Sequence, residues 1–202
     1  MRAMYAFLIT LVWPFFNLFH PCRPIGRGNI PEGGALFCGN HSSLCDPLLV
    51  AYAMGMKNQI RVMAKAELLR VPVLGWLLGK AGIFGVDRGK ADIGAVKQAM
   101  KFLKSGEHVL LFPQGTRVRD GKDHNGNPCE AKTGAALLAV RTGVPLVPVY
   151  IPEHKRWFRP TPIVIGEAFT PVTAEKKGTA EEYEAITKDL MARIYALAEQ
   201  AV

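Results

Sequence analysis

Short apolar runs alternate with stretches of helical periodicity along most of this chain. Apolar runs typical of strands lie at residues 35–40, 81–89, 108–113, 144–151 and 162–169. Helical patterns lie at residues 47–55, 92–106, 130–143 and 179–200. Strands that alternate with helices favour an α/β domain with a buried sheet. We therefore predict an α/β fold: a single domain with a mixed, mostly buried sheet flanked by helices, preceded by an N-terminal membrane-associated helical segment.

Length and charge limit the classes of protein to which this chain can belong. The chain has 202 residues, of which 49% are hydrophobic, which suits one domain with a sizeable core. The net charge of +8 is uneven, because residues 1–101 hold 12 Lys and Arg against 5 Asp and Glu, whereas residues 102–202 hold 13 against 12. A basic first half could face nucleic acid, an anionic membrane or an acidic substrate or carrier, or could simply keep the surface soluble.

The N-terminus is an uncharged, aromatic-rich stretch, AMYAFLITLVWPFFNLF, at residues 3–19. It is shorter than the roughly 20 apolar residues that cross a membrane, and Pro14 and Asn17 interrupt it. No small-residue cleavage site follows it. We expect residues 1–24 to be retained and to lie in or dip into the membrane interface, the alternative being a buried core helix. Residues 25–202 would form the main domain.

The stretch NHSSLCDP at residues 40–47 separates the first strand from the first helix. Asp46 is predicted to cap that helix, with Pro47 in its first turn. His41 and Asp46 could also form a pair in which the carboxylate holds Nδ1–H, so that Nε2 can take a proton from a substrate hydroxyl. The pattern is short, and by itself it leaves open whether Asp46 is only a cap and His41 only a strand-end residue.

Other chemistries find little support in the sequence. Ser42 and Ser43 follow His41 directly, and the GxSxG elbow of serine hydrolases is absent, so both serines are expected to satisfy loop backbone groups. No P-loop is present, and GRGNIP at residues 26–31 has a proline where a dinucleotide loop needs its third glycine. The five histidines lack metal-ligand spacing. We expect neither a metal nor a cofactor.

Cationic residues follow several of the apolar runs. FPQGTR at residues 112–117 combines Gly115, which permits close backbone approach, with Arg117, whose planar fork suits phosphate. Lys65 in KAEL and Arg88 in VDRG occupy similar positions. Three such cations beside a His–Asp pair indicate a substrate that carries both a phosphate and a hydroxyl.

The blocks NHSSLCDP, KAEL, GIFGVDRG, FPQGTR, KTGAALLA and VPLVPV occur in this order. By these blocks and their order, the chain resembles the lysophosphatidate and glycerol-phosphate acyltransferases, and among them the PlsC-type 1-acyl-sn-glycerol-3-phosphate acyltransferases. The resemblance runs from about residue 25 to 170. The resemblance implies transfer of a fatty acyl group from acyl-ACP or acyl-CoA to the sn-2 hydroxyl of lysophosphatidate. The product would be phosphatidate, a precursor in phospholipid biosynthesis. The hydroxyl would attack the thioester directly, so that no acyl-enzyme forms.

The resemblance also implies roles for individual residues. His41 would be the general base and Asp46 would orient it. The acceptor phosphate would be held by Lys65, Arg88 and Arg117, and the loop that meets the acceptor would contain Gln114, Gly115 and Thr116. The apolar stretch at residues 71–79 is a candidate wall for the acyl chain, with core packing as the alternative.

One departure from the family pattern concerns the acceptor. The family usually has glutamate where this chain has Gln114, which keeps a carbonyl acceptor but loses the charge. Glycerol 3-phosphate or another lysolipid is therefore an alternative acceptor. A non-catalytic lipid-binding protein with a decayed site and a thioester hydrolase are alternatives of other kinds. The expected partners are the thioester donor, the lysolipid and the membrane surface, but not nucleic acid, and the expected location is the cytoplasmic face of the cell membrane.

Overall fold

A seven-stranded sheet forms the centre of the computed structural model, which describes residues 2–87, 92–175 and 177–201. The strands lie in the order β1-β7-β6-β2-β5-β3-β4. Their bounds are β1 Cys22–Ile25, β2 Leu36–Gly39, β3 Ile60–Lys65, β4 Ile83–Val86, β5 His108–Leu111, β6 Leu146–Tyr150 and β7 Thr161–Ile165. Strands β6, β2, β5, β3 and β4 are parallel, β7 runs antiparallel to β6, and β1 is parallel to β7. The predicted single α/β domain with a mixed sheet is confirmed.

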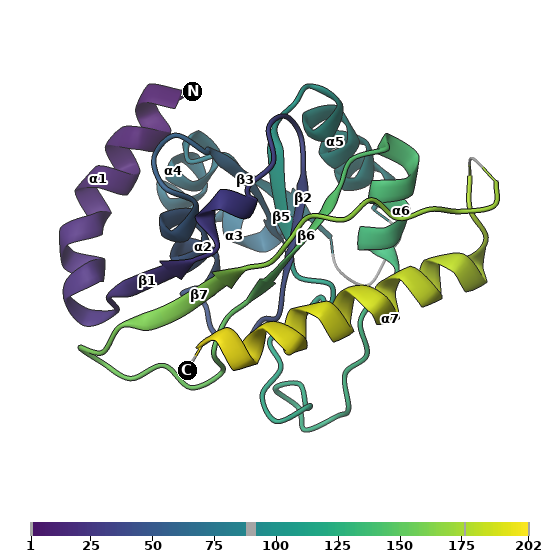
Figure 1. Cartoon of the computed structure of the whole chain (residues 1–202). Coiled ribbons are helices and arrows are strands. Elements are labelled where there is room, and N and C mark those ends of the chain that lie inside the picture. Colours follow the sequence, from purple (N-terminus) through teal and green to yellow (C-terminus); the bar gives the residue numbers. More distant parts are fainter. Residues whose placement is uncertain (1, 88–91, 176, 202) are drawn as a thin grey trace.

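Helices cover both faces of this sheet (Figure 1). They are α1 Arg2–Phe19, α2 Asp46–Met54, α3 Ala66–Arg70, α4 Leu74–Lys80, α5 Ile93–Lys104, α6 Gly134–Thr142 and α7 Ala180–Ala196, with short 3₁₀ turns at Arg27–Asn29 and Leu197–Ala201. Phe37 packs into the core on the side of α2, whereas its neighbour Leu36 packs among residues of α5, α6 and α7. Both side chains are fully buried, because successive side chains of a strand point to opposite faces and β2 is covered on both.

Helix starts are set by local side-chain bonds. Asp92 accepts a hydrogen bond from the backbone of Ala95 and caps α5, and Thr179 and Glu182 form the predicted capping box of α7. The prediction that Asp46 caps α2 is wrong. Asp46 is the first helical residue, and its carboxylate accepts from the backbone N–H groups of Ser42 and Ser43, which precede the helix.

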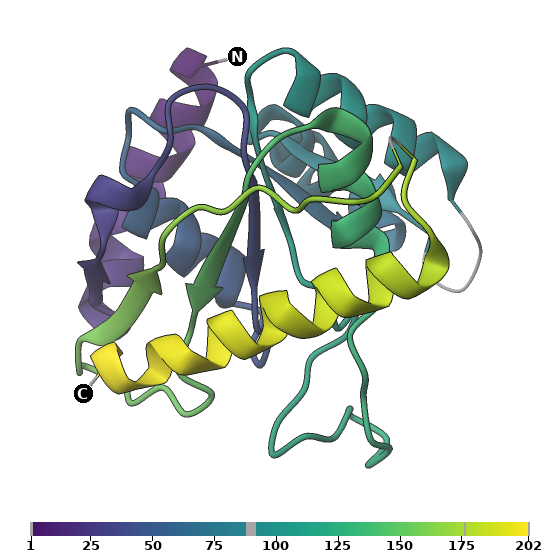
Figure 2. The same cartoon turned by 45° about the vertical axis from the view of Figure 1, so that its right-hand side comes forward.

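The connection between β5 and α6 is long, and the helix that follows it begins later than the sequence predicted. The helix predicted from residue 130 begins at Gly134, because residues 130–133 run back over the FPQGTR loop, where the backbone N–H of Lys132 donates to the carbonyl of Pro113 at 2.8 Å. Figure 2 shows this connection projecting below the sheet, on the side to which β2 and β6 point.

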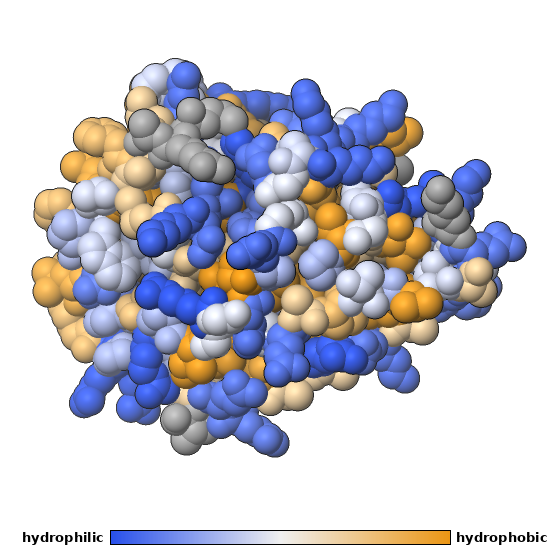
Figure 3. Space-filling model, turned by 45° about the horizontal axis from the view of Figure 1, so that its top comes forward, coloured by the Kyte–Doolittle hydropathy of each residue, from blue (hydrophilic) through white to orange (hydrophobic). Residues whose placement is uncertain are grey.

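The N-terminal segment is helical, as predicted. Helix α1 continues through Pro14 and packs Tyr5, Ile9 and Phe16 against the domain, while Phe7 and Phe15 are 59% and 70% exposed. Its exposed side chains add to the apolar left edge of the molecule (Figure 3). No helix among the described residues is both long enough and apolar enough to cross a membrane.

The parallel strands bring the functional blocks to one edge. NHSSLCDP follows β2, FPQGTR follows β5, and Lys65 ends β3. These strands are neighbours, and the carboxyl ends of neighbouring parallel strands meet at the same edge of a sheet. Loops far apart in the sequence therefore form one site.

Candidate active site

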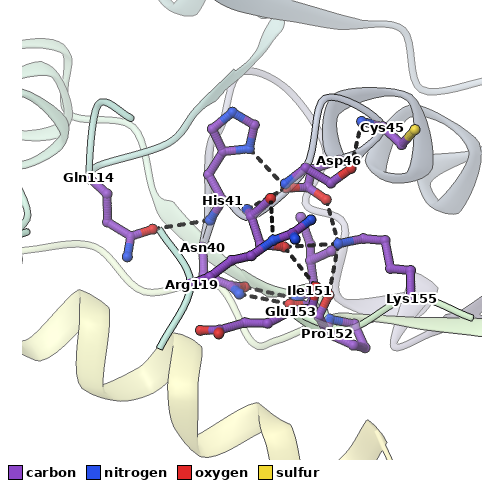
Figure 4. Close-up of polar contacts among 12 residues, drawn as sticks. Asn40, His41, Cys45, Asp46, Gln114, Arg119, Ile151, Pro152, Glu153 and Lys155 are labelled. Carbon is purple, nitrogen blue, oxygen red and sulfur yellow. Dashed lines mark hydrogen bonds and ion pairs between the residues drawn. The ribbon is translucent and has the colours of Figure 1, made fainter. Parts of the chain in front are cut away.

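His41 and Asp46 form the predicted pair (Figure 4). Nδ1 of His41 lies 2.8 Å from Oδ2 of Asp46. An ionised carboxylate only accepts hydrogen bonds, so Nδ1 carries a proton, and in the neutral ring Nε2 is left with a free lone pair. The arrangement suits a general base.

Asp46 is fully buried, yet it is held in its ionised form. Its Oδ2 also accepts from the backbone N–H groups of Ser42 and Ser43, each at 2.7 Å. Burial by itself raises the pKa of Asp46, but the hydrogen bond from His41, the charge and hydrogen bond of Lys155 and the Ser43 amide outweigh it and lower that pKa below its usual value.

Lys155 is a member of this cluster that sequence reasoning missed. Its Nζ lies 2.8 Å from Oδ1 of Asp46 and also donates to Oγ of Ser42 at 2.9 Å. Lys155 follows β6, the strand that pairs with β2. No spacing rule links residues more than a hundred positions apart, so only the strand order could have revealed this contact.

The serines do not act as nucleophiles in this geometry. Ser42 is 3% exposed, and its hydroxyl donates to the carbonyl of Glu153 at 3.4 Å and accepts from Lys155. The hydroxyl of Ser43 accepts from the backbone of Cys45 at 3.3 Å. Both serines therefore satisfy neighbouring polar groups, as expected from the sequence.

The imidazole is fixed by its surroundings. Its ring stacks on Phe112 with centroids 4.2 Å apart and 17° between the planes. The backbone carbonyl of His41 accepts from Val118 at 2.7 Å, and its backbone N–H donates to Oε1 of Gln114 at 3.0 Å. Residues of the FPQGTR segment and its continuation thus hold His41 in place.

His41 lines a cavity of about 780 Å³. One part of its wall is apolar and comes from α1, α2, β3, α4 and β4, through residues such as Ile9, Leu48, Val62, Leu78 and Ile83. Another part is polar and includes Lys65, Gly115, Thr116, Arg117, Asp123 and His124. One cavity therefore joins an apolar chamber, the imidazole of His41 and a polar wall that holds the cations Lys65 and Arg117.

The structure brings most of the predicted site residues together. Lys65 and Arg117 both line the cavity, although Nζ of Lys65 lies 3.2 Å from the carboxylate of Glu67 in a half-exposed pair. Gly115 has φ of +69°, a left-handed backbone conformation that favours glycine, and the side chain of Lys132 lies against it at ordinary contact distance. Arg88 lies outside the described residues.

Gln114 does not line the cavity. It is 4% exposed, and its side chain is directed toward the backbone of His41 (Figure 4). Its Nε2 lies 3.3 Å from the hydroxyl of Tyr195 on α7. Gln114 therefore supports the loop that carries His41, while its neighbours Gly115 and Thr116 line the cavity together with Phe112 and Arg117.

The apolar stretch at residues 71–79 is not packed in the core. Val73 and Trp76 are 73% and 60% exposed, whereas Leu78 lines the cavity. This stretch therefore divides between the cavity wall and an apolar surface.

Among the described residues, no three His, Cys, Asp or Glu side chains gather closely enough to hold a metal ion.

Comparison with known proteins agrees with the geometry. The chloroplastic 1-acyl-sn-glycerol-3-phosphate acyltransferase of Arabidopsis thaliana is 26% identical over 154 residues, which cover 73% of this chain and 41% of that protein. The 1-acyl-sn-glycerol-3-phosphate acyltransferase of Bacillus subtilis (strain 168) is 28% identical over 197 residues and 95% of both chains. The chain spans only 41% to 52% of the length of the first three curated relatives it matches.

The fold is also that of a solved structure. The crystal structure of the 1-acyl-sn-glycerophosphate (LPA) acyltransferase PlsC from Thermotoga maritima matches with a TM-score of 0.66 and 23% identity, over 98% of this chain and 79% of that one. A family model described as Acyltransferase matches residues 23–152, which include the His–Asp pair and the FPQGTR loop. Because that match covers more than half of the chain, the protein belongs to the Acyltransferase family.

Proposed function

We propose that this protein transfers a fatty acyl group from a thioester donor, acyl-ACP or acyl-CoA, to the sn-2 hydroxyl of lysophosphatidate and so produces phosphatidate. The observation that carries the proposal is that His41, with Nδ1 held by Asp46, lines the same cavity as Arg117 and Lys65. The names of the relatives support lysophosphatidate as the acceptor. Glycerol 3-phosphate or another lysolipid is the alternative acceptor, because Gln114 stands where the family usually has glutamate.

The chemistry follows from the position of the base. Nε2 of His41 removes the proton from the acceptor hydroxyl as its oxygen attacks the thioester carbonyl carbon. The resulting tetrahedral oxyanion collapses, the C–S bond breaks, and the imidazolium returns its proton to the departing thiolate. Asp46 holds the ring in one tautomer throughout and stabilises its protonated form. No acyl-enzyme is required.

The cavity separates the two substrates by polarity. Its apolar wall between α1, α2 and β3 is suited to the acyl chain of the donor, since burial of each methylene contributes about 0.8 kcal/mol. Arg117 lies at its polar side and makes no ion pair within the described residues, so its guanidinium can form a paired hydrogen bond with the acceptor phosphate.

The acceptor and product are lipids, and the surface around the cavity fits a membrane. Exposed apolar side chains occur on α1, around α4 and at Leu44, which is 70% exposed and also lines the cavity. An exposed apolar area that leads into an apolar cavity is suited to lipid entry from a bilayer. We place the protein at the cytoplasmic face of the cell membrane, bound peripherally or monotopically.

A single assay tests the function. Purified protein is incubated with acyl-ACP or acyl-CoA, with and without lysophosphatidate, while thiol release and phosphatidate are measured. We expect release that depends on the acceptor and equals phosphatidate formed. His41→Ala should abolish it, whereas His154→Ala, a control at an exposed histidine, should not.

The other outcomes identify the alternatives. Thiol release that is independent of lysophosphatidate would identify a thioester hydrolase. A wild-type protein that binds lipid but releases no thiol would be a binding protein. Transfer to glycerol 3-phosphate in preference to lysophosphatidate would replace the acceptor but keep the chemistry. Full activity of His41→Ala would disprove the role of the pair.

A further inference from the structure

A buried lysine lies behind the His–Asp pair, on the side away from the imidazole. Lys155 has a side chain that is only 5% exposed, and its Nζ contacts Oδ1 of Asp46 at 2.8 Å. It also donates to Ser42 Oγ at 2.9 Å and to the carbonyl of Pro152 at 2.8 Å. The two carboxylate oxygens therefore have different partners, since Oδ2 holds His41 and two backbone amides.

The segment that carries Lys155 is anchored on both sides. Before it, the side chain of Asn40, the residue preceding His41, exchanges two hydrogen bonds with the backbone of Ile151, at 2.7 and 2.8 Å. After it, the backbone N–H of Phe158 donates to the carbonyl of Phe19 at 2.9 Å. The connection that carries Lys155 is therefore hydrogen-bonded to the loop that carries His41, and this places the lysine beside Asp46.

A positive charge at this position affects the proton affinity of the pair. A buried carboxylate without a cation would favour uptake of a proton by the His–Asp pair, and a protonated imidazole cannot accept one from a substrate. Lys155 balances the carboxylate and so favours the neutral imidazole with the lone pair on Nε2. It also fixes the carboxylate plane by binding the oxygen that His41 does not use.

We propose that Lys155 is a positioning residue for the acyl transfer, acting through Asp46 to hold His41 neutral and oriented as the general base. The inference rests on the proposed function and extends it to a residue that touches neither substrate. Two other charged groups lie near the cluster. Arg119 donates to the carbonyl of Ser42 at 3.2 Å, and Glu153 accepts from the backbone of Asp120 at 3.0 Å. Of the three, Lys155 alone pairs with Asp46 within the described residues.

The test compares Lys155→Met, which removes the charge but keeps the length, with Lys155→Arg, which keeps the charge. For Lys155→Met we expect kcat to fall about 10- to 100-fold, KM for both substrates to stay within about twofold, and the acid limb of the kcat/KM profile to move up by about one to three pH units. Lys155→Arg should leave the acid limb in place. Lys188→Met, an exposed lysine on α7, is the matched control.

A second measurement does not depend on turnover. The ¹⁵N signals of the His41 ring, assigned by their loss in His41→Ala, report the tautomer and the pH at which the His–Asp pair takes up a proton. In the wild type we expect the Nδ1–H tautomer, and in Lys155→Met the midpoint should move to higher pH. An unchanged midpoint in a folded Lys155→Met protein would overturn the proposal. A shifted midpoint in a protein whose wild type transfers no acyl group would confirm the effect of Lys155 on the His–Asp pair but reject acyl transfer as the reaction that the pair serves.

Discussion

The side-chain oxygen of Gln114 accepts a hydrogen bond from the backbone N–H of His41 at 3.0 Å. The same side chain reaches Tyr195 on α7 through its nitrogen, at 3.3 Å. An amide meets both needs at once, because its oxygen accepts and its nitrogen donates. The residue that departs from the family pattern therefore supports the loop that carries His41.

Replacement of Gln114 by leucine should destabilise the protein. It leaves the buried N–H of His41 without a partner, which costs about 1–3 kcal/mol. Urea unfolding should show this loss, and kcat should fall with little change in KM for lysophosphatidate. Tyr195→Phe removes only the second contact and should cost less. Gln114→Glu keeps an acceptor for His41, and near-normal folding with normal acceptor preference is expected. A switch of acceptor in Gln114→Glu would show that this position selects the substrate after all.

Asp46→Asn should nearly abolish transfer. The carboxylate accepts three N–H groups through Oδ2 and meets Lys155 through Oδ1. An asparagine has one oxygen, so its NH₂ group must face either those donors or the ammonium. We expect kcat to fall roughly 10³- to 10⁴-fold, as when a base loses its orienting carboxylate. Steady-state kinetics check this, with circular dichroism to verify folding. Activity within tenfold of the wild type would contradict the assigned role.

Arg117 should determine affinity for the acceptor phosphate. Hydrogen bonds to charged groups contribute about 1.5–3 kcal/mol, so Arg117→Ala should raise the acceptor KM by roughly 10- to 100-fold and leave the donor KM unchanged. Arg117→Lys should recover only part of the loss, because an ammonium cannot bind phosphate with two parallel bonds. Lys122→Ala, an exposed cation in the same connection, is the control. An equal rise in both KM values would indicate a general defect instead.

The parts of the site that could be predicted are contiguous in the sequence. His41 and Asp46 lie five positions apart between a strand and a helix, and FPQGTR directly follows a strand, so local pattern indicated both as candidates, although the pair by itself left open whether Asp46 was only a helix cap. Lys155 and Gln114 could not be assigned in this way. The contact of Lys155 requires β6 to lie beside β2, and the orientation of Gln114 depends on how α7 crosses the sheet.

Prediction of the strands from the sequence was limited for the same reason. Strands with mostly apolar residues, such as β2 and β5, were evident, whereas β3 was missed because Arg61 and Lys65 interrupt its apolar pattern. Arg61 is nevertheless buried, since its guanidinium pairs with Glu107 at 2.6 Å. A charge that is neutralised by a distant partner cannot be distinguished from a surface charge by periodicity alone.

His108 should make the protein less stable in mild acid. Its ring lies at the start of β5, 5.2 Å from the ring of Phe37, and burial lowers its pKa. The unfolded chain then binds a proton at His108 more readily than the folded chain does. The free energy of unfolding is therefore unaffected by His108 above the ordinary histidine pKa of about 6.5 and falls as the pH drops below that value. Asp46, whose pKa is also lowered, loses its contribution only below its ordinary value of 3.8.

Melting temperatures at pH 7.5 and 5.5 isolate the effect of His108. The wild type should melt lower at pH 5.5, and His108→Phe should show a smaller difference between the two pH values. His154→Gln, a change at an exposed histidine, should keep the wild-type difference. Identical differences in all three proteins would mean that His108 does not titrate on unfolding.

The exposed face of α1 should control binding to lipid. Phe7 and Phe15 are 59% and 70% exposed, and burial of each phenyl group contributes about 1.5–3 kcal/mol. The variant Phe7→Asp/Phe15→Asp should therefore lose most co-sedimentation with vesicles of phosphatidylglycerol and phosphatidylethanolamine while its melting temperature stays unchanged. The control is Val172→Asp, since Val172 is 89% exposed but lies between β7 and α7, away from α1. If the double variant sediments as well as this control, the face of α1 is not the lipid-binding surface. If both bind less than the wild type, added negative charge rather than lost apolar contact explains the effect.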